Sequence, residues 1–233
     1  MGIFRRKPVL TDDQRRELRL TATEWIAPGF RPRTGLAEEL VDYHDDIEVP
    51  HDVLLSAASE VVEEVWCARL ADEEDWPDTG DFGRLERAFW SLASQGVLAR
   101  MDFSCCGTCG MAEIDDERTP LGGVVDGDYP YKEWAYTFFH QQDSERLVDS
   151  DAVLFLAYSA FRPAAGLDPE LMARAKEGDE EARRQVSTIT DTTVGELVRD
   201  ALVAEGLAVT WNGSSAQRIA VNMPEWRKPL PRG

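Results

Sequence analysis

Residues 97–110 of the chain read VLARMDFSCCGTCG. Apolar side chains alternate with others in the first half of this stretch, which is the two-residue period of a β-strand. Three of the four cysteines in the 233 residues then follow within five positions, at Cys105, Cys106 and Cys109. The stretch therefore predicts a strand that ends in a loop carrying a candidate site, an arrangement in which a rigid element positions functional side chains.

Periodic segments on both sides of this stretch predict the rest of the domain. Between Asp81 and Gly96 an apolar stripe recurs at three- and four-residue steps, as in an amphipathic helix. Downstream we expect a strand over 134–140, a buried strand over 152–161, a charged helical excursion to residue 185, a helix opened by a capping box at Thr193, and a final hairpin. This order predicts an α+β domain with a four- to five-stranded, mainly antiparallel or mixed sheet and flanking helices.

The N-terminal part of the chain has a different pattern. Residues 12–25, 36–43 and the long segment after Pro50 have helical character, without intervening strands. We therefore expect an acidic, helical N-terminal extension over residues 1–80, followed by the α+β domain with the cysteine loop over residues 81–233. The Pro- and Arg-rich tail from Pro224 onward is expected to be loose.

Charge is unevenly distributed along the chain, whose net charge is −19. Residues 1–35 contain eight Lys or Arg and four Asp or Glu, whereas residues 36–81 contain sixteen acids and one base, Arg69. A strongly negative field repels phosphate backbones, so we expect no nucleic-acid partner. The acidic helical region 36–81 is either a solvated surface or a binding face for a basic protein partner.

Hydropathy and cysteine usage indicate the compartment. No stretch of the sequence approaches 18 apolar residues, so we expect no membrane-spanning helix and no membrane partner. The basic N-terminus has no apolar segment behind it and does not resemble a secretory signal. Clustered thiols in a chain without an export signal predict a cytoplasmic protein, in which metal or redox chemistry is favoured over structural disulfides.

Four separated motifs also carry a resemblance: residues 103–110 (FSCCGTCG), 138–143 (FFHQQD), 211–213 (WNG) and 218–219 (RI). Together they resemble the signature of an uncharacterised bacterial family that is catalogued as a domain of unknown function. The resemblance covers residues 81–222 and implies a soluble domain in which the cysteine cluster and the His-Gln-Gln-Asp segment belong together. It implies no activity, substrate or catalytic residue, and residues 1–80 are expected to fall outside it.

The first hypothesis for the cysteines is a metal site that holds Zn²⁺. Cys106 and Cys109 have the Cys-x-x-Cys spacing and the trailing glycine of a zinc knuckle. A structural zinc ion needs four ligands, and Cys105, His140 or a carboxylate such as Asp143 or Glu113 would have to complete the set. Adjacent residues of an extended chain point to opposite sides, so Cys105 and Cys106 can share an ion only where the chain turns.

Other hypotheses stay open beside the metal site. The Cys106/Cys109 pair could act as a thiol redox centre, although the strand–helix context of thioredoxin-like proteins is missing and the surrounding acids disfavour a thiolate. The cysteines could also be packed thiols in an acidic interaction module. His140 could be a ligand or a hydrogen-bonded residue at the core edge. No nucleophile motif or phosphate-binding loop accompanies it, so we expect a binding or regulatory domain more than an enzyme.

Overall fold

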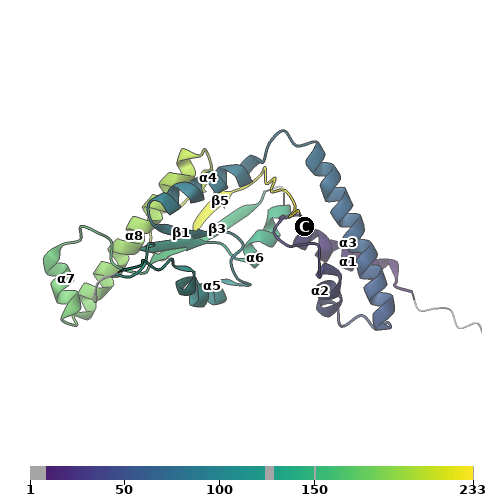
Figure 1. Ribbon diagram of the computed structural model, residues 1–233, viewed down its shortest axis with the longest axis horizontal. Helices are drawn as coiled ribbons and strands as arrows, with labels where there is room; N and C mark the ends of the chain where they lie inside the picture. The colour runs from purple at the N-terminus through teal and green to yellow at the C-terminus, as the bar shows by residue number, and fades with distance from the viewer. Residues whose placement is uncertain (1–8, 124–128, 150, 233) are drawn as a thin grey trace, which may run out of the picture. The chain divides into compact units, whose positions relative to one another are not determined.

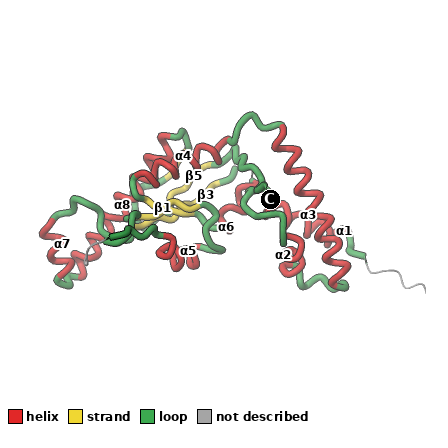
Figure 2. The backbone as a smooth tube through the Cα atoms, viewed as in Figure 1, coloured by secondary structure: helices red, strands yellow, loops and turns green. Residues whose placement is uncertain are grey.

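The computed structural model describes residues 9–123, 129–149 and 151–232, and it divides into two compact units. One unit consists of residues 9–79 together with residues 227–232, and the other is Gly80–Trp226. The elements of both units are labelled in Figure 1, and their secondary structure is coloured in Figure 2. Each unit has its own core and is described separately.

The first unit contains three helices. They are α1 (Asp12–Ile26), α2 (Leu36–Tyr43) and α3 (His51–Glu74). Thr11 begins α1 with a capping box, because its side chain accepts a hydrogen bond from the backbone of Gln14 and the Gln14 side chain accepts one in return. Leu18, Leu40 and Val61, one from each helix, are fully buried in a shared core. Each of the three segments predicted to be helical forms a helix.

Ion pairs connect the basic N-terminal segment to the acidic helix α3 within this unit. The pairs are Arg15–Glu60, Arg19–Glu64 and Arg33–Glu63. Each pair is partly exposed, and such pairs contribute only ~0.2–1 kcal/mol each to stability. Their main effect is on the surface charge, because three arginines of residues 1–35 neutralise glutamates of the acidic region 36–81.

The C-terminal segment is part of the first unit and is not the loose tail that its composition predicts. Arg69 donates a hydrogen bond to the carbonyl of Lys228 (2.7 Å), and the backbone N–H of Leu230 donates one to Glu73 (2.7 Å). The Leu230 side chain is 4% exposed and packs in the core of the three helices. Local composition could not reveal these partners, since they lie 159 and 157 residues away along the chain.

The second unit is built on a five-stranded mixed sheet with the order β1-β2-β3-β5-β4. The strands are β1 (Val97–Arg100), β2 (Ala135–Phe138), β3 (Val153–Ala160), β4 (Ala208–Thr210) and β5 (Ile219–Asn222). β1 and β2 pair in parallel, and the other neighbours pair antiparallel. Flanking helices complete an α+β fold, as the sequence predicts.

Helices cover both faces of the sheet. The helices of this unit are α4 (Gly80–Ser94), α5 (Gly107–Glu113), α6 (Gln141–Ser144), α7 (Pro169–Lys176) and α8 (Glu180–Ala204), with short 3₁₀ turns η1 (Ile114–Glu117) and η2 (Glu145–Val148). Among them, α7 packs against α8. Figure 1 shows α4 and α5 on opposite sides of the sheet. All four residues of β2 are buried, as expected for a strand covered on both faces.

The longest helix differs from the prediction in where it begins. Sequence reasoning placed a new helix start at Thr193, but α8 runs without a break from Glu180 and is capped by Asp179. The Thr193 hydroxyl donates to the carbonyl of Ile189 inside the helix (2.8 Å), so it makes no cap. A Ser/Thr-x-x-Glu pattern marks a helix start only where the preceding residues leave the helical conformation.

The structure also bears on membrane association. Among the described residues, no helix combines the length and the apolar character needed to span a bilayer.

The packing of the C-terminal segment generates a prediction. Leu230→Ala should lower the free energy of unfolding of the first unit by about 2–5 kcal/mol, because it removes a buried side chain and leaves a cavity. Urea unfolding of the full chain, followed by circular dichroism, measures this loss. Arg232→Ala, at an exposed position of the same segment, is the control and should leave stability nearly unchanged. Equal stability of the two variants would show that the tail is not anchored.

Candidate functional site

The cysteine loop and the segment after β2 meet at one edge of the sheet. Because β1 and β2 run parallel, their carboxyl ends lie at the same edge. Backbone hydrogen bonds continue the pairing beyond the strands, from Phe103 N to Phe139 O (2.9 Å) and from Gln141 N to Ser104 O (3.1 Å). The loop that carries the cysteines is therefore attached to the segment that carries His140.

The turn before the cysteines is conformationally strained. Asp102 and Ser104 have positive φ angles of 51° and 61°, which non-glycine residues seldom adopt. The hydroxyl of Ser144, in α6, donates a short hydrogen bond to the Asp102 carboxylate and holds this conformation. Residues kept in such conformations cost about 1–3 kcal/mol each and are concentrated at functional sites.

The start of α5 brings the three thiols together. Cys106 is the last extended residue before the helix, with φ −152° and ψ 170°, and its carbonyl accepts from the N–H of Gly110 (2.9 Å). The chain thus turns directly after Cys106, and Cys109 lies in the first turn of the helix. The Sγ atoms of Cys105, Cys106 and Cys109 all lie within 4.8 Å of one another. The concern that neighbouring cysteines would point apart does not apply to this loop.

The thiols share hydrogen bonds that favour a single negative charge on Cys106. The backbone N–H of Cys109 donates to the Cys106 sulfur and is the main cause of the lowered pKa of that thiol. Hydrogen bonds with Cys105 and Cys106 raise the pKa of Cys109 to about 12. Cys105 is exposed and the other two are half-buried, so reagents in solution can reach the cluster. Among these thiols Cys106 therefore ionises more readily than Cys109.

His140 adjoins the cluster but is bound to another group. Its Nδ1 accepts a hydrogen bond from the backbone of Asp143 (3.2 Å), and its Nε2 lies 3.0 Å from the Asp143 carboxylate. Burial lowers the pKa of His140, against the opposing attraction of Asp143. The imidazole is therefore neutral near pH 7. Both ring nitrogens are engaged, and the structure does not place His140 among the clustered ligand atoms.

Asp143 is the centre of a second cluster that sequence reasoning did not assemble. Its carboxylate is 2% exposed, and it also accepts a hydrogen bond from Arg218 (2.8 Å). A buried carboxylate needs such partners, because an unpaired charge in the interior is strongly destabilising. Asp143 was considered as a metal ligand, but these two bonds direct it toward His140 and Arg218. The signal that could have revealed the contact was the joint occurrence of the motifs at 138–143 and 218–219.

Helix α5, which carries Cys109, packs closely against strand β2. A Cβ atom on Gly110 would lie 2.6 Å from the ring of Phe138, which is fully buried in β2. Phe138 also makes an edge-to-face contact with Phe103, whose ring centroid is 5.7 Å away. A Cβ atom on Gly107, at the first position of the same helix, would meet the His140 ring only at an ordinary 3.5 Å. Gly110 is therefore the residue that lets α5 rest directly on the end of β2.

Among the described residues, the potential ligand group contains only the three cysteines. No His, Asp or Glu atom of these residues joins the sulfurs within the same 4.8 Å limit. The fourth cysteine, Cys67, lies in α3, in the first unit, and donates a hydrogen bond to Glu63 (3.3 Å). That bond is the main cause of its raised pKa. Because Cys67 lies outside the three-cysteine cluster, it serves as a control thiol in experiments on that cluster.

Comparison with known proteins identifies a family and nothing more specific. A family model described as "Domain of unknown function (DUF6891)" matches residues 11–230. The match includes most of residues 1–80, so the expectation that this region falls outside the family was wrong. No curated protein and no solved structure gave a match.

The packing of α5 generates the first prediction at this site. Gly110→Ala should destabilise the second unit by about 1–3 kcal/mol, because the added methyl group would overlap the Phe138 ring and displace α5. Gly107→Ala is the matched control, since its methyl group would meet His140 at 3.5 Å, and it should be tolerated. Urea unfolding measures both variants. Equal stability would mean that α5 is not held against β2.

The unequal thiol pKa values generate the second prediction. In metal-free protein at pH 7, limited iodoacetamide treatment should modify Cys106 before Cys109 or Cys67, because only the thiolate is nucleophilic. The Cys106 rate should rise with pH and level off at a lower pH than that of an ordinary thiol. Peptide mass spectrometry measures the order of modification, and unfolded protein, in which the thiols become equivalent, is the control. Faster modification of Cys67 would contradict the assignment.

Proposed function

Because the chain belongs to the DUF6891 family, whose description assigns no activity, we propose a function from the geometry of its own residues. The protein is a metal-binding domain in which Cys105, Cys106 and Cys109 hold a Zn²⁺ ion. The single observation that carries this proposal is the convergence of three sulfur atoms within 4.8 Å. Such a domain would serve a binding or regulatory role rather than a structural one, for the reasons that follow.

The ligand set suits a soft or borderline metal ion. Zinc–thiolate bonds of about 2.3 Å place the sulfurs of a tetrahedral site about 3.8 Å apart, so a small contraction of this cluster would close it around the ion. Sulfur ligands favour zinc and copper(I) over magnesium or calcium, which prefer oxygen. Hydrogen bonds with the neighbouring thiols and their charges raise the pKa of Cys109. A bound dication would lower that pKa, because its positive charge attracts the thiolate.

The fourth coordination position supports a binding or regulatory role. Structural zinc sites have four protein ligands, whereas sites with three keep a position for water or an exchangeable ligand. His140 would have to leave both contacts with Asp143 to occupy that position. We therefore assign the fourth position to water or to a ligand from a partner molecule, next to the exposed Cys105.

Thiol redox chemistry is the second candidate, and the lowered pKa of Cys106 favours it. The Cys106 thiolate would attack a disulfide such as oxidised glutathione and release one glutathione thiolate. Cys109, after losing its proton, would then displace the second glutathione and form the Cys106–Cys109 disulfide. Two protein thiols would be oxidised and one disulfide of the reagent reduced to two thiols.

Metal analysis separates the two candidates. We expect purified protein to bind one zinc ion per chain, with tighter binding as the pH rises, because the thiols must lose protons to coordinate the metal. Cys106→Ser and Cys109→Ser should each abolish stoichiometric binding. Cys67→Ser is the matched control and should retain one zinc. Inductively coupled plasma mass spectrometry measures the metal, and thiol titration before and after chelation measures protection.

Two results would count against the zinc site. Protein that takes up no zinc after reduction and reconstitution, but forms a Cys106–Cys109 disulfide with oxidised glutathione, would support the redox candidate instead. Four thiols that neither bind metal nor form a disulfide would exclude both candidates.

A further inference from the structure

A cavity of about 400 Å³ lies in the second unit, where β3 ends between α7 and α8. The residues that line it run from Ser159 to Asp191 and include none of the cysteines. Small-molecule sites typically measure about 300–1,000 Å³, so this cavity is the size of a small metabolite site. It is independent of the thiol cluster and of the function proposed for it.

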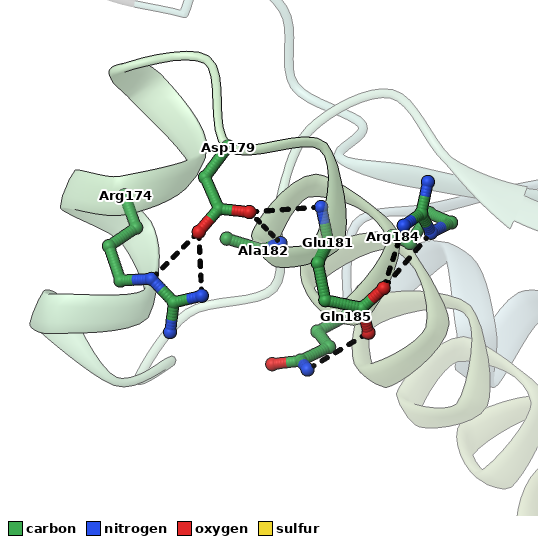
Figure 3. Close-up of polar contacts among 6 residues, drawn as sticks. All are labelled: Arg174, Asp179, Glu181, Ala182, Arg184 and Gln185. Atoms are coloured by element: carbon green, nitrogen blue, oxygen red, sulfur yellow. Dashed lines mark hydrogen bonds and ion pairs between the residues drawn. The ribbon is translucent and has the colours of Figure 1, made fainter.

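The corner between α7 and α8 holds two sides of the cavity in a fixed geometry. Asp179 caps α8 by accepting hydrogen bonds from the backbone of Glu181 (3.0 Å) and Ala182 (3.1 Å). Its other carboxylate oxygen takes two hydrogen bonds from Arg174 of α7 (2.9 and 2.6 Å). Figure 3 shows Asp179 between the two helices. The pKa of Asp179 is lowered, chiefly by its backbone bond to Ala182, so the corner stays ionised and closed near pH 7.

One carboxylate provides an acceptor within the cavity. Asp191, on α8, accepts a hydrogen bond from the Ser159 hydroxyl (2.7 Å) and a longer one from the Ser187 hydroxyl (3.4 Å). A carboxylate has about four acceptor positions, so these bonds leave room for further donors. Within the described part of the chain, Asp191 has no ion-pair partner. A ligand ammonium group could supply that partner.

Three cationic side chains line the same cavity, although the protein carries a net charge of −19. Lys176 is at the end of α7, Arg162 follows β3, and Arg183 is on α8. Arg183 is engaged, because it donates to the Ala175 carbonyl (3.0 Å) and pairs with Glu180 (3.3 Å). Lys176 has no ion-pair partner among the residues that the structure describes. Lys176 and Arg162 thus offer cations for a ligand carboxylate on elements other than α8, which carries Asp191.

The remaining lining is apolar and includes Phe161, Met172 and Val186. Val186 is buried, and the other two are half-buried beside the charged groups. Apolar surface of this kind favours the body of a ligand, while the few polar groups set its orientation. The two kinds of lining together specify a molecule with an apolar centre and charged ends.

We propose that this cavity binds a zwitterionic ligand with an apolar body, of the class of apolar dipeptides, with its ammonium group at Asp191 and its carboxylate at Lys176. A purely anionic ligand would leave the Asp191 charge unpaired, and a purely cationic one would face three positive side chains. A dipeptide also separates its two charges by more than a single amino acid does, which suits partners on different helices. Both partners of the ligand's charges, Asp191 on α8 and Lys176 on α7, line this one cavity.

The test uses L-leucyl-L-leucine as the probe and isothermal titration calorimetry of the full-length protein. We expect a Kd of about 100 μM or tighter. N-acetyl-L-leucyl-L-leucine, which lacks the ammonium group, and L-leucyl-L-leucinamide, which lacks the carboxylate, should each bind at least ~10-fold more weakly, as expected when one ion pair is lost.

Two variants assign each charge to its partner. Asp191→Asn keeps a hydrogen-bond acceptor for Ser159 and should weaken binding of the free dipeptide ~10-fold while removing its advantage over the N-acetyl form. Lys176→Met should instead make the affinity for the free dipeptide equal to that for L-leucyl-L-leucinamide, which lacks the carboxylate. Asp200→Asn on the same helix and Lys132→Met, outside the cavity, are the matched controls and should bind as the unaltered chain does. Thermal unfolding of each variant confirms that it is folded.

The proposal is overturned by any of three results. These are no heat of binding with the dipeptide at millimolar concentration, equal affinity for the free and blocked dipeptides, or folded Asp191 and Lys176 variants that discriminate as the unaltered chain does. None of these results depends on whether the cysteines bind metal.

Discussion

The parallel pairing of β1 with β2 is the constraint on which the candidate site depends. It places the carboxyl ends of both strands at one edge, where the backbone pairing continues through Phe103 and Ser104. The same pairing explains the strained turn, because Asp102 and Ser104 must adopt positive φ angles for the chain to stay attached to β2 and still turn into α5. The thiols are thus positioned by a strand pairing and by the contact of Gly110 with Phe138.

Two clusters lie at this edge, one of partly exposed thiols and one of hydrogen-bonded polar groups around the buried Asp143 carboxylate. The sulfur cluster is partly exposed, and the pKa of its Cys106 thiol is lowered, chiefly by the backbone N–H of Cys109. The cluster of His140, Asp143 and Arg218 is closely connected, since the Asp143 carboxylate accepts a hydrogen bond from Arg218 and lies 3.0 Å from His140 Nε2, while the Asp143 N–H donates to His140 Nδ1. A satisfied polar network is rigid, and its members are poor ligands because coordination would break existing bonds. The segment that carries His140 is joined to the loop by the bond from Gln141 N to Ser104 O, while the sulfurs keep the capacity to coordinate a metal.

Arg69 shows how one side chain can organise a unit. It is the only base in the acidic region 36–81, and it is 9% exposed. Its guanidinium donates to the carbonyls of Ala27 and Lys228 and pairs with Glu73, which in turn accepts from Leu230. A planar group with five donors can join three chain segments in this way, whereas a lysine could not reproduce the geometry. The acidic region is thereby connected to both the basic N-terminal segment and the C-terminal tail.

The sequence by itself determined the fold class and most of the secondary structure, because hydrophobic periodicity and capping residues act over a few neighbouring positions. It predicted the α+β sheet domain, the helices before it, and the three cysteines as one group. Only the tertiary structure decided which groups meet. Asp143 pairs with Arg218, 75 residues later, and Leu230 packs against helices near the N-terminus. The tertiary structure also decided that His140 lies against Asp143 and that α8 continues through Thr193. The physical reason is that competition among partners for a side chain is settled by distances across the fold, which local sequence does not contain.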